Sequence, residues 1–386
     1  MNSTERHELR YQRRRARREE NRRKRNEEIG TLDSIFAYHR VFRAGRKCCN
    51  GVRWKQSIQN FELHLFSRTA RACRSVKNGT WHGTGYSHFI LCERGKLRPI
   101  DAPHITDRQV HKIVTQDILY PLYRPSMIKE NGASQPNMGL SFHFSLLKEN
   151  LHQHYRIYGR NGYVVLIDLK SFFPGAPHWA VYQRHDRLIY DGQIRNLCDQ
   201  VIQDFEKYKR SDIGMPLGVE PSQIEMVALP SATDTYARCQ LGVDSLAHYM
   251  DDYHALFPTL EEAENFLAKV EHLFQNQGLQ INKNKCRIVP LTKKFKFCKA
   301  TFWLTDTGKV ICRRDRKSFS RARHKIRSFV RMVKEGLMSL DEIKNWYKVQ
   351  SSQFKNSNDH NRVLRLNRFI YNLFKFELGG AQLCLS

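Results

Sequence analysis

The chain has 386 residues, of which 40% are hydrophobic and 11% aromatic, enough for two or three subdomains around a substantial core and too many for a disordered chain. Lysine and arginine outnumber aspartate and glutamate by 65 to 38, so the net charge of +27 predicts a polyanionic partner. No apolar run reaches membrane-spanning length and no apolar core follows the basic start, which predicts a soluble cytoplasmic protein without a membrane partner.

The ten cysteines are scattered between Cys48 and Cys384, with no C-x-x-C pair and no histidine at zinc-finger spacing. Cys48 and Cys49 are adjacent, which argues further against metal geometry. We therefore expect neither a zinc site nor a disulfide framework, and interpret the thiols as reduced packing residues.

The first predicted element is a charged arm over residues 1–28, almost without apolar side chains and rich in arginine between Arg13 and Arg25. Such a block is typical of a segment that binds nucleic acid or an acidic protein, and the alternative is a solvated helix without a partner. Apolar residues then recur every three or four positions over 35–65, which predicts helices. Strands are predicted at 86–91 and 95–103, followed by a helix over 107–123.

Residues 163–168 read Tyr-Val-Val-Leu-Ile-Asp, the pattern of a buried strand that ends in a carboxylate. A helical region is predicted over 178–210. Glycines at both ends of 214–218 indicate a loop, and the next helix is predicted over 221–237. Residues 246–256 then form two short apolar runs around an acidic turn, which predicts a hairpin.

After the hairpin, residues 261–277 carry apolar side chains at helical spacing, and strands are predicted around 279–289, 295–304 and 308–313. The chain from 314 onward is basic, with an apolar stripe that predicts helices. No internal repeat is present.

Three carboxylates carry the main functional hypothesis. Asp168 ends a predicted strand, while Asp251 and Asp252 occupy the turn of the predicted hairpin. Nucleotidyl transfer uses two divalent ions that stabilise the attacking and leaving oxygens, and hard cations prefer carboxylates on rigid strands. An Asp-Asp pair alone is usually a solvated turn, but here it lies between apolar runs in a basic chain with a second strand-terminal aspartate.

The turn Tyr-Met-Asp-Asp at 249–252 resembles the Tyr-x-Asp-Asp turn of the reverse transcriptase family, and Asp-Leu-Lys-Ser-Phe-Phe at 168–173 resembles that family's first catalytic motif. The resemblance implies that Asp168, Asp251 and Asp252 bind two Mg²⁺ ions, for which Mn²⁺ can substitute. It also implies that the backbone carbonyl of Leu169 is a ligand and that Phe173 is a steric gate against ribonucleotides.

Further motifs of the family follow in order, so that the resemblance covers about residues 35–310. It implies that the incoming nucleotide contacts two basic residues of a finger strand, the aromatic pair, a glutamine and a later lysine: Lys96, Arg98, Phe172, Phe173, Gln223 and Lys285. Residues implied near template and primer are Arg108, Gly218, Ser222, Tyr249, Met250, Arg321 and Arg327. The hairpin around 295–301 is a poor match to the family's primer grip.

The resemblance implies an α+β fold of right-hand shape, with fingers, an antiparallel-sheet palm and a helical thumb. We expect a basic arm at 1–30, fingers at 31–160, a palm at 161–313 and a thumb at 314–386, with part of 178–212 packing on the fingers. The implied activity is RNA-directed DNA synthesis from an RNA template and a DNA or RNA primer, with deoxynucleotides as substrates.

Most relatives have Ser-Pro where this chain has Ser222-Gln223, and this pair is similar to the bacterial enzymes of diversity-generating retroelements. That subfamily implies a small basic accessory protein and a structured RNA as partners. The acidic Glu220 in this loop departs from the pattern. Alternatives are a defence-associated or prophage reverse transcriptase, a non-catalytic RNA-binding protein of polymerase-like shape, and a polymerase that copies DNA or no template. A group II intron maturase fits less well, because about 75 residues after the primer-grip region leave no room for an endonuclease.

Overall fold

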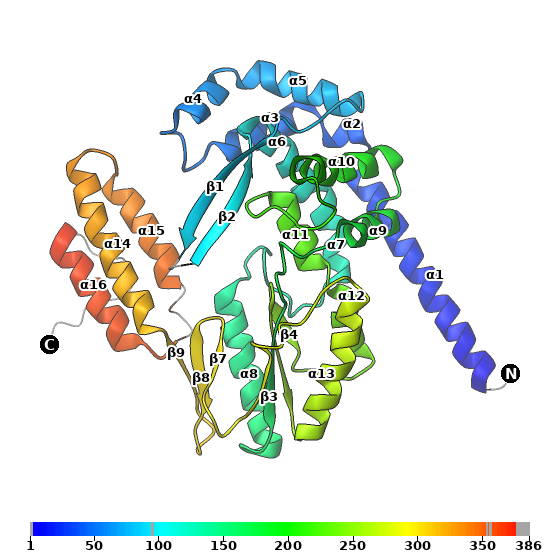
Figure 1. Cartoon of the computed structure of the whole chain (residues 1–386), viewed down its shortest axis with the longest axis vertical. Coiled ribbons are helices and arrows are strands. Elements are labelled where there is room, and N and C mark those ends of the chain that lie inside the picture. Colours follow the sequence, from blue (N-terminus) through cyan, green and yellow to red (C-terminus); the bar gives the residue numbers. More distant parts are fainter. Residues whose placement is uncertain (1–2, 94–95, 353, 355–356, 376–386) are drawn as a thin grey trace. The chain divides into compact units, whose positions relative to one another are not determined.

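A computed structural model describes residues 3–93, 96–352, 354 and 357–375 of the chain (Figure 1). Two compact units make up the fold, and each is built from separate stretches of sequence. Unit 1 comprises the described residues up to Ile128, together with Leu169–Tyr236 and Glu271–Gln280. Unit 2 comprises Lys129–Asp168, Ala237–Val270 and the described residues from Ile281 onward. Helices and antiparallel strands are both present, so the chain has the predicted α+β fold.

Unit 1 is mainly helical and carries one hairpin. Its elements are α1 (Ser3–Ile29), α2 (Leu32–Ile35), α3 (Tyr38–Cys48), α4 (Gln56–Leu63), α5 (Leu65–Lys77), β1 (Tyr86–Glu93), β2 (Lys96–Pro103), α6 (Ile105–Ile113), the π-helical η1 (Val114–Leu119), α7 (Tyr120–Tyr123), the 3-10 turn η2 (Arg124–Ser126), α9 (His178–Leu188), α10 (Gly192–Lys209) and α11 (Glu220–Ala228). Two further helices, α12 (Ser231–Cys239) and α13 (Leu260–Gln275), have residues in both units.

The helix α10 shows how the sequence specifies these elements. Asp191 caps its start, because the side-chain oxygen accepts hydrogen bonds from the backbone N–H groups of Gln193 and Ile194. Buried apolar residues then recur at helical spacing along one face: Ile194, Leu197, Cys198, Val201, Ile202 and Phe205. The cap and the stripe together place α10 against the core of unit 1.

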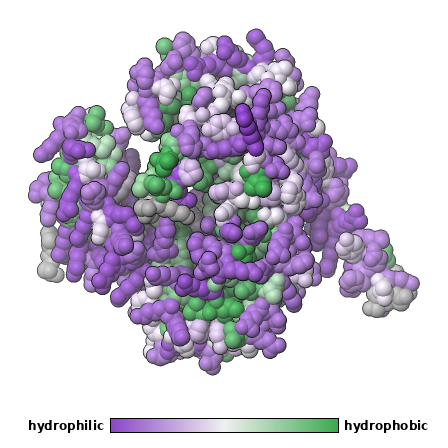
Figure 2. Space-filling model, in the orientation of Figure 1, coloured by the Kyte–Doolittle hydropathy of each residue, from purple (hydrophilic) through white to green (hydrophobic). Residues whose placement is uncertain are grey.

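The hairpin β1–β2 leaves large apolar side chains exposed, namely those of Phe89, Ile90, Leu91 and Leu97. Its strands pair antiparallel from Tyr86 opposite Pro103 to Glu93 opposite Lys96. Figure 2 shows a hydrophobic patch, in green, in the region where Figure 1 draws β1 and β2.

Buried charges connect three helices of unit 1. His185 on α9 is fully buried, and its Nδ1 lies 2.5 Å from Asp199 Oδ1 of α10 while its Nε2 lies 2.8 Å from Glu225 Oε1 of α11. Burial alone would lower the pKa of His185, but the charges and hydrogen bonds of Glu225 and Asp199 outweigh it and raise that pKa to about 9. A positively charged imidazole thus stabilises two carboxylates inside the unit.

Unit 2 contains two antiparallel sheets. Its elements are α8 (Leu140–Tyr158), β3 (Tyr163–Asp168), β4 (Ala247–Tyr249), β5 (Asp252–Phe257), β6 (Arg287–Pro290), β7 (Phe295–Phe297), β8 (Ala300–Leu304), β9 (Val310–Arg314), α14 (Arg316–Lys334), α15 (Leu340–Ser352) and α16 (His360–Phe374). The strand order is β4-β5-β3-β6 in the larger sheet and β7-β8-β9 in the smaller one.

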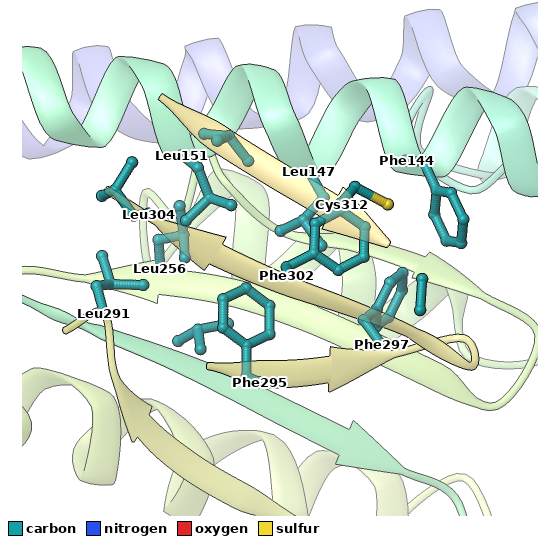
Figure 3. Packing of buried hydrophobic residues seen from close by; sticks show 13 residues of the cluster. Phe144, Leu147, Leu151, Leu256, Leu291, Phe295, Phe297, Phe302, Leu304 and Cys312 are labelled. Carbon is teal, nitrogen blue, oxygen red and sulfur yellow. The ribbon is translucent and has the colours of Figure 1, made fainter. Parts of the chain in front are cut away.

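The core of unit 2 lies between α8 and the two sheets (Figure 3). Phe144, Leu147 and Leu151 repeat along one face of α8 and pack against residues such as Phe302 of β8 and Leu256 of β5. Each of these side chains is buried, and full burial of a leucine or phenylalanine contributes about 1.5–3 kcal/mol. This packing fixes the strands whose ends carry the acidic residues.

The helices α14, α15 and α16 follow β9 and share a separate core that includes Phe319, Ile326, Tyr347 and Ile370. The prediction of helices in this part of the chain is confirmed for the described residues. The domain boundaries at 30, 160 and 313 stay predictions. None of the helices in the described part of the chain is both long and apolar enough to cross a membrane.

Several predicted elements are wrong in part. The helix expected over 221–237 is divided into α11 and α12, and the strand expected over 295–304 is divided into β7 and β8. The strand expected over 279–289 begins only at Arg287, because the residues before it form a turn. In this turn the backbone N–H of Asn282 donates to the carbonyl of Asp168 (2.8 Å), and the N–H of Lys285 donates to the carbonyl of Asn282 (2.9 Å). The chain thus leaves strand geometry at the point where it reaches the end of β3.

Candidate active site

The three predicted carboxylates lie at one end of the larger sheet of unit 2. Asp168 is the last residue of β3, and Asp252 is the first residue of β5 and its direct partner in the antiparallel register. Directly opposite residues in such a pair share a face of the sheet, with Cβ atoms about 4.5–5.5 Å apart. Asp251 precedes Asp252 in the turn between β4 and β5. The register therefore brings two carboxylates together and places the third beside them.

The turn between β4 and β5 has an unusual backbone. Met250 has φ +57°, a left-handed conformation that costs a side-chain-bearing residue about 1–2 kcal/mol. His248 supports it, because its Nδ1 lies 3.2 Å from the Met250 carbonyl oxygen and can donate a hydrogen bond to it. The His248 ring is fully buried and stacks on Tyr253 with a centroid distance of 4.4 Å. The fold thus maintains a strained turn at the acidic pair.

Asp168 is held by the turn that precedes β6. Its Oδ1 accepts a hydrogen bond from Asn282 Nδ2 (3.1 Å), and its Oδ2 lies 2.7 Å from the ammonium of Lys285. These contacts raise the pKa of Lys285 above its ordinary value, chiefly through the hydrogen bond to Asp168. Lys285, predicted to approach the nucleotide, thus pairs with the carboxylate of Asp168.

Asp252 is the most strongly perturbed acid of the group. Burial is the largest cause and the charge of Asp251 the next, and with a contribution from Asp168 they raise the pKa of Asp252 to about 6. The hydrogen bond that the Cys298 thiol donates to Asp252 Oδ2 at 3.5 Å opposes this rise, with an effect larger than that of Asp168. Cys298 lies in the turn between β7 and β8, where it and Lys299 both have positive φ.

A divalent cation suits this group of residues. The charges of Asp251 and Asp168 help to raise the pKa of Asp252, and a bound cation would relieve this repulsion; carboxylate oxygens are also ligands that Mg²⁺ and Mn²⁺ accept. In the part of the chain that the structure describes, no three His, Cys, Asp or Glu side chains already enclose a space for an ion. Asp168 instead points to Asn282 and Lys285, so the carboxylates fit a cation in chemistry but are not yet arranged around one.

The predicted residues that follow Asp168 belong to unit 1. Leu169 and Phe172 are buried, whereas Phe173 is partly exposed and contacts Phe172 edge-on at a centroid distance of 5.7 Å. The backbone around Phe173 is fixed, because its carbonyl accepts a hydrogen bond from the N–H of Met215 (2.8 Å). This bond joins two predicted nucleotide-binding stretches, 168–173 and 214–218.

The residues predicted to line the templating base pair lie at the start of α11. Gly218 is exposed with φ +94°, Ser222 is buried, and Gln223 is exposed. The unexpected acid of this loop, Glu220, is neutralised by Lys112 of α6, with Nζ–Oε2 at 2.8 Å. Glu220 thus joins α11 to α6, which gives this departure from the family pattern a structural reason.

The other predicted contacts are basic or lie beside the acidic turn. Arg98 on β2 is partly exposed and Arg108 on α6 is exposed, both in unit 1. The side chain of Lys96 lies outside the described part of the structure. Arg321 and Arg327 are exposed on α14, and Arg327 lies over the ring of Phe369 at 5.4 Å.

Tyr249, predicted beside the primer, is the last residue of β4, opposite Asp252. Its ring is edge-on to His143 at a centroid distance of 5.4 Å, and burial raises its pKa.

Three residues at the acidic site escaped the sequence analysis as site residues. Asn282 and Cys298 contact the carboxylates directly, and His248 supports the turn that carries them. The position of Asn282, three residues before Lys285, was a usable signal, because a turn places such residues side by side. Cys298 and His248 gave no signal, since each acts through a neighbour that only the folded sheets bring close.

A protein-family model described as reverse transcriptase (RNA-dependent DNA polymerase) matches residues 79–301, more than half of the chain. The matched region contains the three carboxylates, Lys285 and Cys298, whereas α1 and α14–α16 lie outside it. No curated protein matches the chain.

The solved structures that match this chain include two telomerases. Telomerase from Candida albicans in complex with a TWJ fragment of telomeric RNA has 11% identity and a TM-score of 0.42, and the match covers 75% of this chain and 62% of that one. Apo telomerase from Candida tropicalis, truncated from the C-terminal domain, has 11% identity and a TM-score of 0.43, with 60% and 55% covered. The chain thus spans less than two thirds of either telomerase chain.

Proposed function

Because this chain belongs to the reverse transcriptase (RNA-dependent DNA polymerase) family, we propose that it copies an RNA template into DNA, with Asp168, Asp251 and Asp252 as its catalytic carboxylates. The observation that carries the assignment of these residues is the register of the larger sheet, in which Asp168 is directly opposite Asp252. Burial and mutual repulsion raise the pKa of Asp252 to about 6, which supports a site for positive charge.

Asp168, Asp251 and Asp252, with the carbonyl of Leu169, would hold two Mg²⁺ ions, or Mn²⁺ in their place. When bound, such ions stabilise the attacking and leaving oxygens of an in-line displacement. Asn282 orients Asp168 through its 3.1 Å hydrogen bond, and His248 keeps the Asp-Asp turn in position through the Met250 carbonyl. Lys285 has two candidate anions, the carboxylate of Asp168 and the triphosphate of the incoming nucleotide.

Residues of unit 1 would select the nucleotide and place the template. We assign Arg98 and Lys96 to the triphosphate, because bidentate or charge-assisted hydrogen bonds suit phosphate oxygens. Phe173, partly exposed and supported by Phe172, is the proposed gate against the ribose 2′-hydroxyl. Gln223 is exposed at the start of α11, as a residue beside the nascent base pair must be.

Primer extension by the purified full chain tests the function. We expect incorporation of dTTP on poly(rA) with oligo(dT) in Mg²⁺ or Mn²⁺, and weaker extension on poly(dA). Asp251→Asn should lower the rate by roughly 10²–10³-fold or more, because it removes charge where the transition state needs it. Asp244→Asn is the matched control: its side chain is 96% exposed, it makes the same change in charge, and it should leave the rate unchanged.

Several results would contradict the proposal. Wild-type inactivity with both metals, on poly(rA) and on a structured RNA, would favour a non-catalytic RNA-binding protein. Equal extension on poly(dA) would instead indicate a polymerase that does not require RNA. Full activity of Asp251→Asn would reject the assignment of the catalytic carboxylates, but the membership of the chain in the reverse transcriptase family would stand.

The gate has its own test, Phe173→Ala. Removal of the ring should raise the efficiency of ribonucleotide incorporation relative to deoxynucleotides by at least tenfold, because the ring would no longer exclude the 2′-hydroxyl. Phe172→Leu is the control, since Phe172 is buried and should affect stability more than sugar selection. Unchanged sugar discrimination in Phe173→Ala rejects the role.

Within the family, the Ser222-Gln223 pair supports a bacterial or phage enzyme of a diversity-generating retroelement, with a basic accessory protein and a structured RNA as partners. Sequencing of the cDNA made on a defined RNA tests this subfamily. Errors concentrated opposite template adenines support it, and uniform fidelity favours a defence-associated or prophage enzyme.

A further inference from the structure

In the described part of the chain, the hydrogen bonds that attach α1 to the rest of unit 1 come from its C-terminal half, from Glu19 onward. Asn26 donates a hydrogen bond to the Leu188 carbonyl (3.1 Å) and accepts one from the N–H of Tyr190 (2.9 Å), and the hydroxyl of Tyr190 donates to Glu19. Residues 4–19, in contrast, are all exposed. Figure 1 shows this part of α1 extending beyond α7 and α9 of the same unit. The attached C-terminal half fixes the direction in which the exposed part extends.

The exposed part of α1 carries a stripe of four arginines, Arg10, Arg13, Arg14 and Arg17. Their spacing of i, i+3, i+4 and i+7 places them within an arc of about 100° over about 10 Å of helix. Among the residues that the structure describes, these four form no ion pair, whereas Arg22, Arg23 and Lys24 are paired with Glu19 or Glu20. We call this set the arginine stripe.

The opposite face of α1 is different in charge and in position. It carries Glu8, Gln12 and Arg15, with Gln12 Nε2 donating to Glu8 Oε1 at 3.0 Å. By helical geometry, the anchoring residues Glu19 and Asn26 lie on this same face, roughly 180° from the arginine stripe. The arginine stripe therefore points away from the surface on which α1 is anchored, and a large ligand can reach it without meeting unit 1.

The composition of α1 distinguishes among three possible ligands of the arginine stripe: a membrane surface, single-stranded RNA and a nucleic-acid duplex. A membrane-surface helix needs a continuous apolar face opposite its basic one, and Glu8, Gln12 and Arg15 do not provide it; the exposed Leu9 and Tyr11 are single apolar side chains on a mostly hydrophilic helix (Figure 2). Single-stranded RNA is bound mainly by stacking of successive bases on several aromatic rings, but the exposed part of α1 offers one tyrosine, Tyr11, which lies outside the arginine stripe. Four guanidinium groups on a straight helix instead suit the regularly spaced phosphates of a duplex.

We propose that the arginine stripe of α1 binds the phosphate backbone of an RNA duplex, as a second RNA-binding surface remote in sequence from the matched polymerase region. This inference deepens the proposed function, because a folded part of the template RNA is the natural source of such a duplex. Phosphate contacts of this kind are independent of sequence and fix position. They also relieve the repulsion among neighbouring arginines, which otherwise destabilises an exposed helix.

The test compares two double variants of the full chain with equal change in charge. Arg13→Gln with Arg17→Gln removes half of the arginine stripe, and Arg15→Gln with Arg23→Gln removes two arginines from the other side of α1. The probe is an RNA hairpin with a 20-base-pair stem, titrated by fluorescence anisotropy at several salt concentrations. Each lost phosphate contact lowers the slope of log K against log salt by about 0.9 for a duplex.

We expect the stripe variant to lose about two units of slope and at least tenfold in affinity near physiological salt, and the control variant to change affinity less than twofold. Equal losses in the two variants would overturn the proposal, since they would show that only total charge matters. Tighter binding to a DNA hairpin of the same sequence would overturn the assignment to RNA. Displacement of the RNA hairpin by equimolar polyglutamate would overturn it in favour of an acidic protein partner.

Primer extension separates this inference from the polymerase function. Both double variants should extend oligo(dT) on poly(rA), which has no stem, within twofold of the wild-type rate. If the chain is inactive in that assay, the salt slopes still decide the role of the arginine stripe. If it is active but the stripe variant binds the hairpin like the wild type, the arginine stripe has no such role and the proposed function stands.

Discussion

His185 in unit 1 and Asp252 in unit 2 are both ionisable side chains whose pKa values are raised by the fold, but for opposite reasons. His185 lies between two carboxylates that stabilise its positive charge. Asp252 is partly buried beside two further acids that oppose its negative charge. A raised pKa therefore reports a stabilising contact for the base and an energetic cost for the acid. We call His185 with Asp199 and Glu225 the balanced cluster, because its charges offset one another and stabilise the folded unit. The acids Asp168, Asp251 and Asp252 form an unbalanced cluster, which is suited to binding a cation.

Removal of His185 should give the largest effect on stability. His185→Leu leaves Glu225, which is 2% exposed, and Asp199 without their partner, so the free energy of unfolding in urea should fall by about 3–5 kcal/mol. His178→Leu on the same helix is the control: His178 contacts the Gly214 carbonyl (2.8 Å) and Glu206 (3.3 Å), but the Glu206 side chain is 37% exposed and stays solvated, so the loss should be about 1–2 kcal/mol. Equal losses would contradict the stabilising role of the contacts that His185 makes with Asp199 and Glu225.

The same cluster predicts how stability depends on pH. The pKa of His185 is about 9 when folded and near 6.5 when unfolded, so the folded state binds this proton more tightly. The stabilisation is complete below pH 6.5 and is lost as pH rises through 9. Relative to His185→Leu, the wild type should lose about 3 kcal/mol of unfolding free energy between pH 6.5 and 9.5. A constant difference across this range would contradict the balanced arrangement.

In unit 2, the hydrogen bond from His248 that supports the acidic turn can be removed without changing Asp168, Asp251 or Asp252. His248→Phe preserves a ring to stack on Tyr253 but loses the donor to the Met250 carbonyl, so kcat in primer extension should fall about tenfold. The KM for dTTP should stay within twofold, because His248 positions the turn and contacts no substrate. His248→Asn can donate to the same carbonyl and should recover part of the rate, and failure to do so would indicate a general packing defect.

The smallest predicted effect is on the free energy of unfolding, and it tests whether the charge of Asp252 destabilises the folded protein. Asp252→Asn removes a charge directly opposite Asp168, so the free energy of unfolding without divalent metal should rise by about 1 kcal/mol while activity is lost. Asp244→Asn, with the same change in charge at an exposed position, should alter stability by less than about 0.5 kcal/mol. A clear loss of stability in Asp252→Asn would place Asp252 with the balanced cluster instead.

Much of the scaffold of the acidic site follows from local pattern. The apolar run at 163–168 and the two runs at 246–256 were predicted as strands, and both predictions are confirmed because side-chain alternation and turn length act over a few residues. The strand predicted at 279–289 failed in its first half, since Asn282 and Lys285 form a turn against Asp168, more than a hundred residues earlier. Apolar pattern alone does not report such a distant partner.

The roles of Glu220 and Cys298 could not be predicted for the same reason, because each depends on a partner that is distant in the sequence. Glu220 seemed out of place near a nucleotide, but Lys112 neutralises it from 108 residues away. Cys298 was assigned to packing, and its contact with Asp252 depends on the turn between β7 and β8. The family resemblance supplied residue roles that pattern could not, and the assignments of Phe173, Arg98 and Gln223 stay predictions.

The direct pairing of Asp168 with Asp252 makes the number of residues in these strands as important as their identity. Side chains alternate between the faces of a sheet, so one inserted or deleted residue in β3 would turn Asp168 to the other face while Asp252 stayed in place. A one-residue insertion inside β3 is therefore a more complete way to separate the carboxylates than many substitutions. We therefore expect this protein to tolerate insertions where they do not change which face of a sheet a side chain occupies, for example in exposed connections between elements.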